Sequence, residues 1–180
     1  MTLDMLTRLD IHAISSAELV RLRPALAALL VEAVDGGASL GFLSPLAVDA
    51  ARGYWRSLGA EVEAERRIVV VASHGSRVVG SGQLALPTWP NARHRAEVQK
   101  LFVDATLRGR GVGRALMLAL HDAARQRGRR LLLLGARHAD PAVQFYKAVG
   151  YQEAGVIPGY AIDARGERHD NVSMYHELAP

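Results

Sequence analysis

Residues 98–114, with the sequence VQKLFVDATLRGRGVGR, decide the fold of this 180-residue chain. Polar and apolar residues alternate along 97–103, which predicts a β-strand. Three glycines then follow at every second position, and apolar residues recur at helical spacing from 112 to 127. The segment therefore predicts a strand that runs into a glycine-rich turn, which opens directly into a helix.

The glycine-rich turn has the composition of a pyrophosphate-binding loop. A helix N-terminus offers unpaired N–H groups and partial positive charge, and glycine lets a phosphate approach them closely. Arg108, Arg110 and Arg114 add guanidinium donors. Two rival loops do not fit, because a Walker A loop needs Lys-Ser/Thr where Arg114-Ala115 stands, and a dinucleotide fingerprint needs glycine at Arg114. The alternative is a tight turn with solvated arginines.

The chain before this segment predicts an edge strand, two helices and an antiparallel hairpin. Ser15 and Glu18 have capping-box spacing, so a helix is expected from there to residue 34, with a restart or kink at Pro24. Ser44-Pro45 has the pattern of an N-cap followed by proline at the first helical position, which predicts a second helix to about residue 65. The strands are expected at 6–12, 68–73 and 78–86.

The chain after the segment continues the alternation of strands and helices. The continuous apolar run 131–134 predicts a buried strand. Asp140-Pro141 predicts the start of a short helix that ends at Gly150, and strands are expected at 151–155 and 172–178 with a loop at 158–160 between them. The length and this order of elements predict a single α/β domain over residues 1–180.

The composition excludes several classes of protein. With 49% hydrophobic residues the chain is not disordered. The absence of cysteine excludes a disulfide framework, a thiolate zinc site and a cysteine nucleophile. The seven histidines show no ligand spacing, so no metal site is predicted. No stretch approaches the ~20 apolar residues of a membrane span, and no secretory signal is evident, so we expect a cytoplasmic protein.

The positive charge of the chain is concentrated in one region. The formal net charge is +4, and eight arginines fall between residues 108 and 137. Such a patch indicates an anionic partner such as phosphate, nucleic acid or a membrane surface. Aromatic residues are not interleaved with the arginines, which argues against nucleic acid and favours a coenzyme phosphate.

The glycine-rich turn resembles a known family signature. The stretch 108–113, RGRGVG, fits the Arg/Gln-x-x-Gly-x-Gly/Ala pattern of the GNAT superfamily of acetyl-CoA-dependent N-acetyltransferases, and 145–151, FYKAVGY, fits its downstream segment. A narrower resemblance, to acetyltransferases of the tabtoxin-resistance type, covers most of 20–175 through 36–42, 95–101 and 158–160. The resemblance implies an α/β fold with a mixed, mostly antiparallel sheet, splayed central strands and helices on both faces.

The resemblance also implies a coenzyme site, with acetyl-CoA as co-substrate and no metal. Backbone groups of the strand would hold the pantetheine and polarise the thioester, and those of the turn would hold the pyrophosphate. Tyr146 matches the tyrosine that the family uses as general acid toward the coenzyme sulfur; the alternative is a half-buried helix tyrosine. The implied coenzyme-binding residues are Leu101, Phe102, Val103, Arg108, Gly109, Arg110, Gly111, Val112, Gly113 and Arg114.

Glu97 is the candidate general base. An alkylamine is mostly protonated at neutral pH, so a base must remove a proton before the amine can attack a thioester. Strand alternation places Glu97, Gln99 and Leu101 on the face opposite Val98, which can point Glu97 toward the acceptor, directly or through water. The alternative is an edge glutamate paired with a neighbouring arginine or with Lys100.

The acceptor side is expected to be built by the segment after the first helix and by the late loop, with an aromatic wall from a tryptophan. Each of these residues also has a structural explanation, as a helix cap, a core residue or a packed loop tip. The substrate-binding candidates are Gly37, Ser39, Phe42, Trp89, Glu97 and Tyr160. Two departures from the family pattern are Ala139, where asparagine is frequent, and Gly135, where the tabtoxin-resistance type has an acid.

The sequence thus predicts acetyl transfer to the amine of a small molecule, such as an amino-acid-like toxin or antibiotic, by direct attack in a ternary complex. One alternative is acetylation of a protein N-terminus or a lysine, which needs an open groove. Another is a non-catalytic acyl-CoA-binding sensor. No nucleic-acid or membrane partner is expected. Homodimers are common among similar proteins, and the sequence does not decide the oligomeric state.

Overall fold

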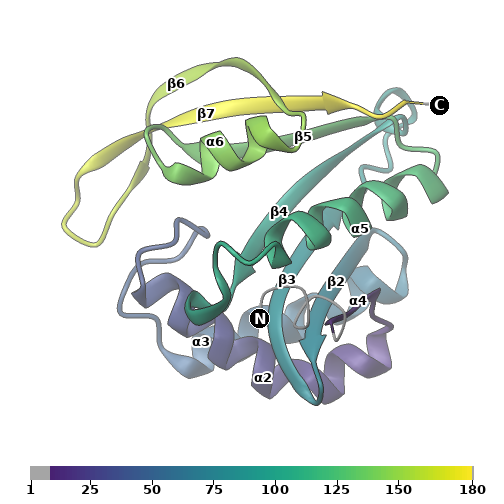
Figure 1. Cartoon of the computed structure of the whole chain (residues 1–180), viewed down its shortest axis with the longest axis vertical. Coiled ribbons are helices and arrows are strands. Elements are labelled where there is room, and N and C mark those ends of the chain that lie inside the picture. The colour runs from purple at the N-terminus through teal and green to yellow at the C-terminus, as the bar shows by residue number, and fades with distance from the viewer. Residues whose placement is uncertain (1–8, 180) are drawn as a thin grey trace.

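Seven strands form one sheet in the computed structural model, which describes residues 9–179 (Figure 1). The strands lie in the order β1-β2-β3-β4-β5-β7-β6. All neighbouring strands are antiparallel except β4 and β5, so the predicted mixed, mostly antiparallel sheet is confirmed. The strands span Leu9–Ala13 (β1), Arg67–His74 (β2), Arg77–Ala85 (β3), Arg95–Val103 (β4), Leu131–Arg137 (β5), Gln152–Ile162 (β6) and Arg168–Glu177 (β7).

The central strands β4 and β5 separate along their length. They pair in parallel only where Arg95–Glu97 faces Leu131–Leu133. Beyond Glu97, β4 continues beside β3 to Val103, while β5 continues beside β7 to Arg137. The sheet is therefore split between the C-terminal parts of β4 and β5, as the splayed central strands were expected to be.

Helices cover both faces of the sheet (Figure 1). Apolar residues of α2 (Ser16–Asp35) and α3 (Val48–Ser57) share one core cluster with Val69 and Val71 of β2. Residues of α5 (Val112–Gln126) and α6 (Pro141–Ala148) share the other cluster with Ile68 and Val70. Because consecutive side chains of a strand point to opposite faces, α2 and α3 cover one face and α5 and α6 the other.

Helix α2 begins and ends as predicted but passes through its proline. The Ser15 hydroxyl accepts a hydrogen bond from the Glu18 N–H, and the Glu18 carboxylate accepts one from the Ser15 N–H, so the capping box is complete. The helix ends at Gly36. Pro24 lies inside the continuous helix α2, so the predicted restart is wrong, and a kink at this residue stays a prediction. Burial of residues on both sides of Pro24, from Leu19 to Val34, stabilises the continuous helix.

The predicted helix start at Ser44-Pro45 is also wrong. The Ser44 hydroxyl donates a hydrogen bond to the Asp35 carboxylate at 2.9 Å, so it does not cap a helix. Helix α3 begins at Val48, and α4 (Gly59–Glu63) is a separate short helix after Leu58. The segment between α2 and α3 is therefore a long connection, tied to the end of α2 through Asp35.

A β-bulge at Lys100 changes which residues of β4 face the acceptor side. Ser81 of β3 faces Phe102, but Gln83 faces Gln99, so β4 contains one extra residue at this point. Lys100 has a φ of +50°. Gln99 and Lys100 both lie on the α3 face, whereas Leu101 packs toward α5. The expectation that Leu101 shares a face with Glu97 and Gln99 is wrong, because the bulge reverses the alternation.

The two C-terminal strands are longer than predicted. Residues 158–160 lie within β6, not in a loop, although the pairing with β7 is irregular between Ile157 and Ala161. At the other edge of the sheet, the predicted strand 6–12 corresponds to β1, and its residues 6–8 lie outside the described range. Within residues 9–179, no helix is both long enough and apolar enough to cross a lipid bilayer.

Candidate active site

The glycine-rich turn presents an open helix N-terminus at the end of β4. Gly109 and Gly111 have φ values of +71° and +87°, a region that L-residues with a Cβ rarely occupy. Gly111 is the N-cap of α5, and no side chain caps its first amides. Arg108, Arg110 and Arg114 around it are exposed. The turn therefore offers free N–H groups, the positive end of a helix dipole and three guanidinium groups.

Asp104 caps the short 3-10 turn Ala105–Leu107 that connects β4 to the glycine-rich turn, a role that sequence reasoning missed. Its buried carboxylate accepts hydrogen bonds from the Thr106 N–H at 2.8 Å and the Thr106 hydroxyl at 2.6 Å, and forms an ion pair with Arg77. These contacts lower the pKa of Asp104, the bond from the Thr106 hydroxyl most strongly. The local signal was the Asp-x-Thr pattern, which is typical of a turn closed by its own side chain.

Helix α6 brings Tyr146 to the same side of the sheet as the turn. Asp140 caps α6 through the Ala142 N–H at 2.8 Å, so this predicted helix start is confirmed. Tyr146 is half-buried beside Phe145 and Tyr151, with ring centroids 5.3 and 6.0 Å away. Burial raises the pKa of Tyr146 to about 12, with a smaller contribution from Asp140. The phenol is therefore a neutral proton donor at pH 7.

Contacts between α5 and α6 bring the turn close to this helix. A Cβ at Gly113 would lie 3.5 Å from the Phe145 ring, and an Arg114 guanidinium nitrogen lies 3.5 Å from the Ala148 carbonyl oxygen. Ala139, just before α6, has a φ of +64°. Asparagine tolerates this conformation better than alanine does, which gives a backbone reason for the asparagine that the resemblance led us to expect there.

The opposite face of the sheet contains a connected set of polar side chains, which we call the acceptor-side patch. The hydroxyl of Tyr54 donates to the buried Gln83 at 2.8 Å, and one guanidinium nitrogen of Arg67 donates to Gln83 at 3.1 Å and to Gln99 at 2.8 Å. The Lys100 ammonium lies 5.4 and 5.7 Å from the ring centroids of Phe42 and Tyr54. The patch is formed by Phe42, Tyr54, Arg67, Gln83, Gln99 and Lys100.

Glu97 lies on the same face as this patch. Its neighbours Ala96 and Val98 belong to the core on the α5 side, so its own side chain points to the α3 side. Glu97 is half-buried, and in the described part of the chain no basic group comes within 4.0 Å of its carboxylate. The ion pairs with an arginine or Lys100 that formed the alternative explanation are therefore not present among these residues.

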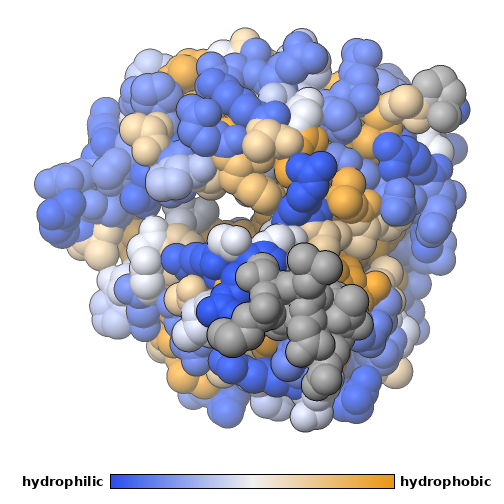
Figure 2. All heavy atoms as spheres, in the orientation of Figure 1, coloured by the Kyte–Doolittle hydropathy of each residue, from blue (hydrophilic) through white to orange (hydrophobic). Residues whose placement is uncertain are grey.

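The split in the sheet lies between the face with the glycine-rich turn and the face with the acceptor-side patch. Helices α5 and α6 lie on one face and the patch on the other, and paired strands leave no passage between the faces. Beyond Glu97, β4 has no partner in β5. Figure 2 shows an opening between the part of the molecule that contains α6, β6 and β7 and the part that contains α2 and α3. Two molecules bound from opposite sides could meet at this opening.

Only some of the other predicted substrate residues lie near the acceptor-side patch. Phe42 belongs to the patch, and Gly37 and Ser39 are exposed in the connection between α2 and α3. Tyr160 is 64% exposed on β6. Trp89 is 72% exposed and lies before the start of β4, at the end opposite the glycine-rich turn. The structure does not bring Trp89 together with the other candidates.

Asn171 occupies the space beside Gly135, where an acid was expected from the narrower resemblance. A Cβ at Gly135 would lie 2.8 Å from the Asn171 side-chain oxygen. Gly135 lies in the part of β5 that has separated from β4. An acidic side chain at 135 would therefore have to displace Asn171, a half-buried amide that sequence reasoning did not single out.

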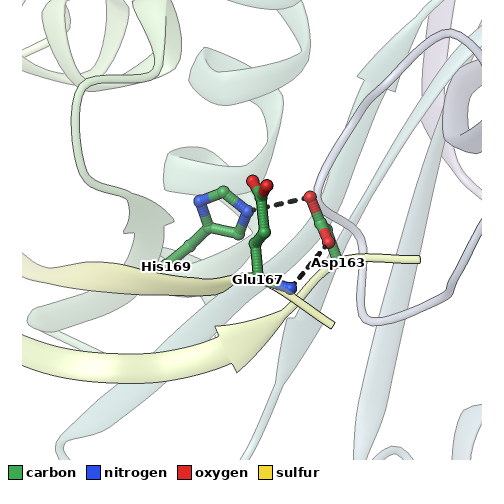
Figure 3. Close-up of side chains that lie close together, drawn as sticks. All are labelled: Asp163, Glu167 and His169. Atoms are coloured by element: carbon green, nitrogen blue, oxygen red, sulfur yellow. Dashed lines mark hydrogen bonds and ion pairs between the residues drawn. The ribbon is translucent and has the colours of Figure 1, made fainter. Parts of the chain in front are cut away.

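Three potential metal ligands meet at the turn between β6 and β7 (Figure 3). Ligand atoms of Asp163, Glu167 and His169 lie within 4.8 Å of one another. Arg165 bridges the two carboxylates, at 3.3 Å from Asp163 and 2.9 Å from Glu167, and Asp163 also accepts the Arg165 and Glu167 N–H groups. Because a guanidinium already neutralises the carboxylates, the cluster is explained as the ion-pair network that closes the hairpin.

Comparisons with known proteins agree with this arrangement. Residues 65–153 match the model of the acetyltransferase (GNAT) domain. The chain is 40% identical over 70 residues to an uncharacterized N-acetyltransferase of Methanocaldococcus jannaschii, covering 38% of this chain and 30% of that one. It is 33% identical over 96 residues to the IAA acetyltransferase of Azospirillum brasilense, covering 52% of this chain and 60% of that one. These matches span less than two thirds of either relative.

Solved structures share the fold over nearly the whole chain. A putative acetyltransferase from Salmonella typhimurium, solved with its cofactor acetyl-CoA, superposes with a TM-score of 0.75 and is 18% identical. The match covers 96% of this chain and 95% of that one. At this identity the likeness establishes the arrangement of helices and strands, and the chemistry has to be argued from the residues.

Proposed function

Because residues 65–153 of the chain match the model of the acetyltransferase (GNAT) domain, we propose that the protein transfers an acetyl group from acetyl-CoA to the amine of a small molecule. The observation that carries this proposal is the split between β4 and β5, which connects an anion-binding turn on one face with a polar patch on the other. A donor with a pyrophosphate and an acceptor with an amine fit these two sides.

The donor side supports a coenzyme. The first amides of α5, freed by Gly109 and Gly111, would hold the pyrophosphate, with Arg108, Arg110 and Arg114 adding charge. Residues 98–103 of β4 lack a β5 partner, and backbone groups of 101–103 within this part would be available to the pantetheine and to the thioester oxygen. The structurally similar Salmonella protein was solved with acetyl-CoA as its cofactor.

The chemistry follows from Glu97 and Tyr146. Glu97 takes a proton from the acceptor ammonium, directly or through water, and the free amine attacks the thioester carbonyl carbon. The tetrahedral intermediate collapses as the carbon–sulfur bond breaks, and the Tyr146 phenol gives its proton to the leaving thiolate. The products are an amide and the coenzyme thiol. Most of the rate would come from proximity and from polarisation of the carbonyl, so no covalent enzyme intermediate is needed.

A small acceptor is favoured over a protein chain by the surroundings of the acceptor-side patch. The connection between α2 and α3 places Phe42 against the patch, and Gly41 lies over Lys100. An extended peptide would need this side to be open. The narrower tabtoxin-resistance resemblance stays a prediction, since Gly135 stands where that type has an acid and Asn171 fills the space beside it.

The test is a thiol-release assay with acetyl-CoA and a panel of alkylamines, amino acids, aminoglycosides and peptides with free N-termini. We expect turnover with at least one small amine and none with peptides. Turnover of peptides alone would replace the small-molecule acceptor with a protein one. Acetyl-CoA binding without turnover of any acceptor would indicate a non-catalytic sensor.

A further inference from the structure

Lys100 is a half-buried cation that forms no ion pair with the carboxylates of residues 9–179. Within residues 9–179, no carboxylate oxygen lies within 4.0 Å of its ammonium nitrogen, and the ammonium donates no hydrogen bond to another residue. The other cation of the acceptor-side patch, Arg67, differs in this respect, because it pairs with Glu61 at 2.6 Å and with two glutamine oxygens. Among the described residues, the patch therefore has one cation in an ion pair, Arg67, and one without an ion pair, Lys100.

The surroundings of Lys100 form a site and not a solvated surface. The rings of Phe42 and Tyr54 flank the ammonium, and a Cβ at Gly41 would lie 3.0 Å from its nitrogen. Burial lowers the pKa of Lys100 and the nearby Arg67 lowers it further, while the smaller effect of the Glu97 charge raises it. A charge removed from water in this way is stabilised by a bound anion that accepts its hydrogen bonds.

The backbone of β4 is strained to present this side chain. Lys100 occupies the bulge with a φ of +50°, a conformation that is unfavourable for a residue with a Cβ and that is frequent at functional sites. Without the extra residue, Lys100 would follow the alternation onto the α5 face. The bulge instead places it on the same face as Glu97 and Gln99.

Glu97 and Lys100 form a complementary pair of charges on this face. Their backbone positions are about 10 Å apart or less along the strand, and their charged atoms are more than 4.0 Å apart, so the two do not neutralise each other directly. A molecule with an ammonium and a carboxylate can lie between them. We propose that the acceptor is an α-amino acid or a close analogue, bound with its amine at Glu97 and its carboxylate at Lys100. This assignment rests on the proposed acetyl transfer.

The test compares each L-amino acid with its C-terminal amide in the acetyl-CoA thiol-release assay. The two molecules carry the same amine and side chain and differ in the carboxylate that Lys100 would bind. With the wild-type protein we expect kcat/KM for the best amino acid to exceed that for its amide by at least about 10-fold. Equal turnover of acid and amide would overturn the inference without the use of any variant.

Variants of Lys100 and Lys147 test whether the preference for the amino acid over its amide depends on Lys100. Lys100→Met keeps the aliphatic stem and removes the charge, so KM for the amino acid should rise at least about 10-fold with little change in kcat, while KM for the amide stays the same. Lys100→Arg should retain part of the preference. Lys147→Met, at the chain's other lysine, which is exposed and paired with Glu153, should leave both substrates unchanged.

The outcomes separate this inference from the proposed function. If amines without a carboxylate are acetylated and amino acids are not, acetyl transfer stands and the carboxylate site is wrong. A parallel loss of both substrates in Lys100→Met would likewise show that Lys100 acts on the fold and not on the carboxylate. If no amine of any kind is acetylated, the proposed function itself fails.

Discussion

At the scale of single residues, the two proposed proton-transfer groups differ in what their removal should do. Glu97→Gln should lower kcat/KM about 100-fold near neutral pH, because the amide cannot accept the proton of the acceptor ammonium. The loss should shrink as pH rises, since an alkylamine then loses its proton to solvent. A pH–rate profile measures this. Glu63→Gln, an exposed glutamate on α4, is the matched control.

An unchanged pH dependence in Glu97→Gln would contradict its assignment as base. In that case Glu97 would only shape the acceptor site, and the proton would leave by another route.

Tyr146→Phe should lower kcat about 100-fold with little change in KM for acetyl-CoA. The phenol has a pKa raised to about 12, so the wild-type residue donates a proton throughout the neutral range. Phenylalanine keeps the ring packed against Phe145 and Tyr151. Steady-state kinetics check the prediction, and Tyr175→Phe on β7 is the control. Full turnover in Tyr146→Phe would exclude the acid role.

His121 should make the free energy of unfolding depend on pH. Burial, and then the charge of His176, lower its pKa to about 4, so the folded protein holds it neutral at a pH where the unfolded chain binds a proton. Above about pH 6.5 His121 does not lower the free energy of unfolding. As the pH falls from 6.5 to 4, the unfolded chain binds a proton that the folded protein does not, and the free energy of unfolding decreases. The loss is about 3 kcal/mol, from 1.36 kcal/mol for each pKa unit.

Urea unfolding at pH 7 and pH 4.5 measures this loss. His121→Phe preserves the stacking on His176 and Tyr151 and should reduce the difference between the two pH values. His74→Phe, at an exposed histidine, should leave it as in the wild type. An equal pH dependence in all three proteins would mean that His121 is already accessible to protons.

At the scale of elements, both ends of α5 depend on a glycine with positive φ, which provides a matched pair of variants. Gly111→Ala strains the N-cap, where φ is +87°, and should weaken acetyl-CoA binding at least about 10-fold by moving the amides that bind phosphate. Gly128→Ala strains the C-terminal end of the same helix, where φ is +66°.

Both variants should lose about 1–2 kcal/mol of stability, but only Gly111→Ala should lose affinity in calorimetric titration with acetyl-CoA. An equal loss of affinity in both would mean that α5 acts through stability alone.

The elements that sequence reasoning predicted are those whose signals are local. The strand β4, the glycine-rich turn and α5 are fixed by short-range alternation, glycine spacing and helical periodicity, and all three are confirmed. Ser44-Pro45 failed because its hydroxyl bonds to Asp35, a partner outside the pattern. The bulge at Lys100 has no sequence signature, since it depends on pairing with β3, and it decides which side chains reach the acceptor face.

At the scale of the whole molecule, acetyl-CoA should raise the melting temperature. A ligand that binds only the folded state at a concentration of 100 times its Kd stabilises that state by about 2.7 kcal/mol. For a chain of this size the shift is about 5–10 °C. Differential scanning fluorimetry measures it, with AMP at the same concentration as the control. Absence of a shift, together with DNA binding that weakens steeply with salt, would restore the nucleic-acid hypothesis.

The short parallel pairing between β4 and β5, which we call the seam, also affects how the two halves of the sheet can move. In the described part of the chain, the β1–β4 half and the β5–β7 half of the sheet are joined at one end of the split, by pairing of Arg95–Glu97 with Leu131–Leu133 and by N–H groups of Arg130 and Leu131 that donate to the His94 carbonyl oxygen. A rotation of one half of the sheet against the other would break the fewest backbone hydrogen bonds at this short pairing. Small rotations of the two halves about this hinge would widen or narrow the opening while each half keeps its own hydrogen bonds. Backbone pairing therefore restrains the width of the passage at one end only, and the apolar cluster shared by Val98, Leu132 and Val172 holds the two halves together.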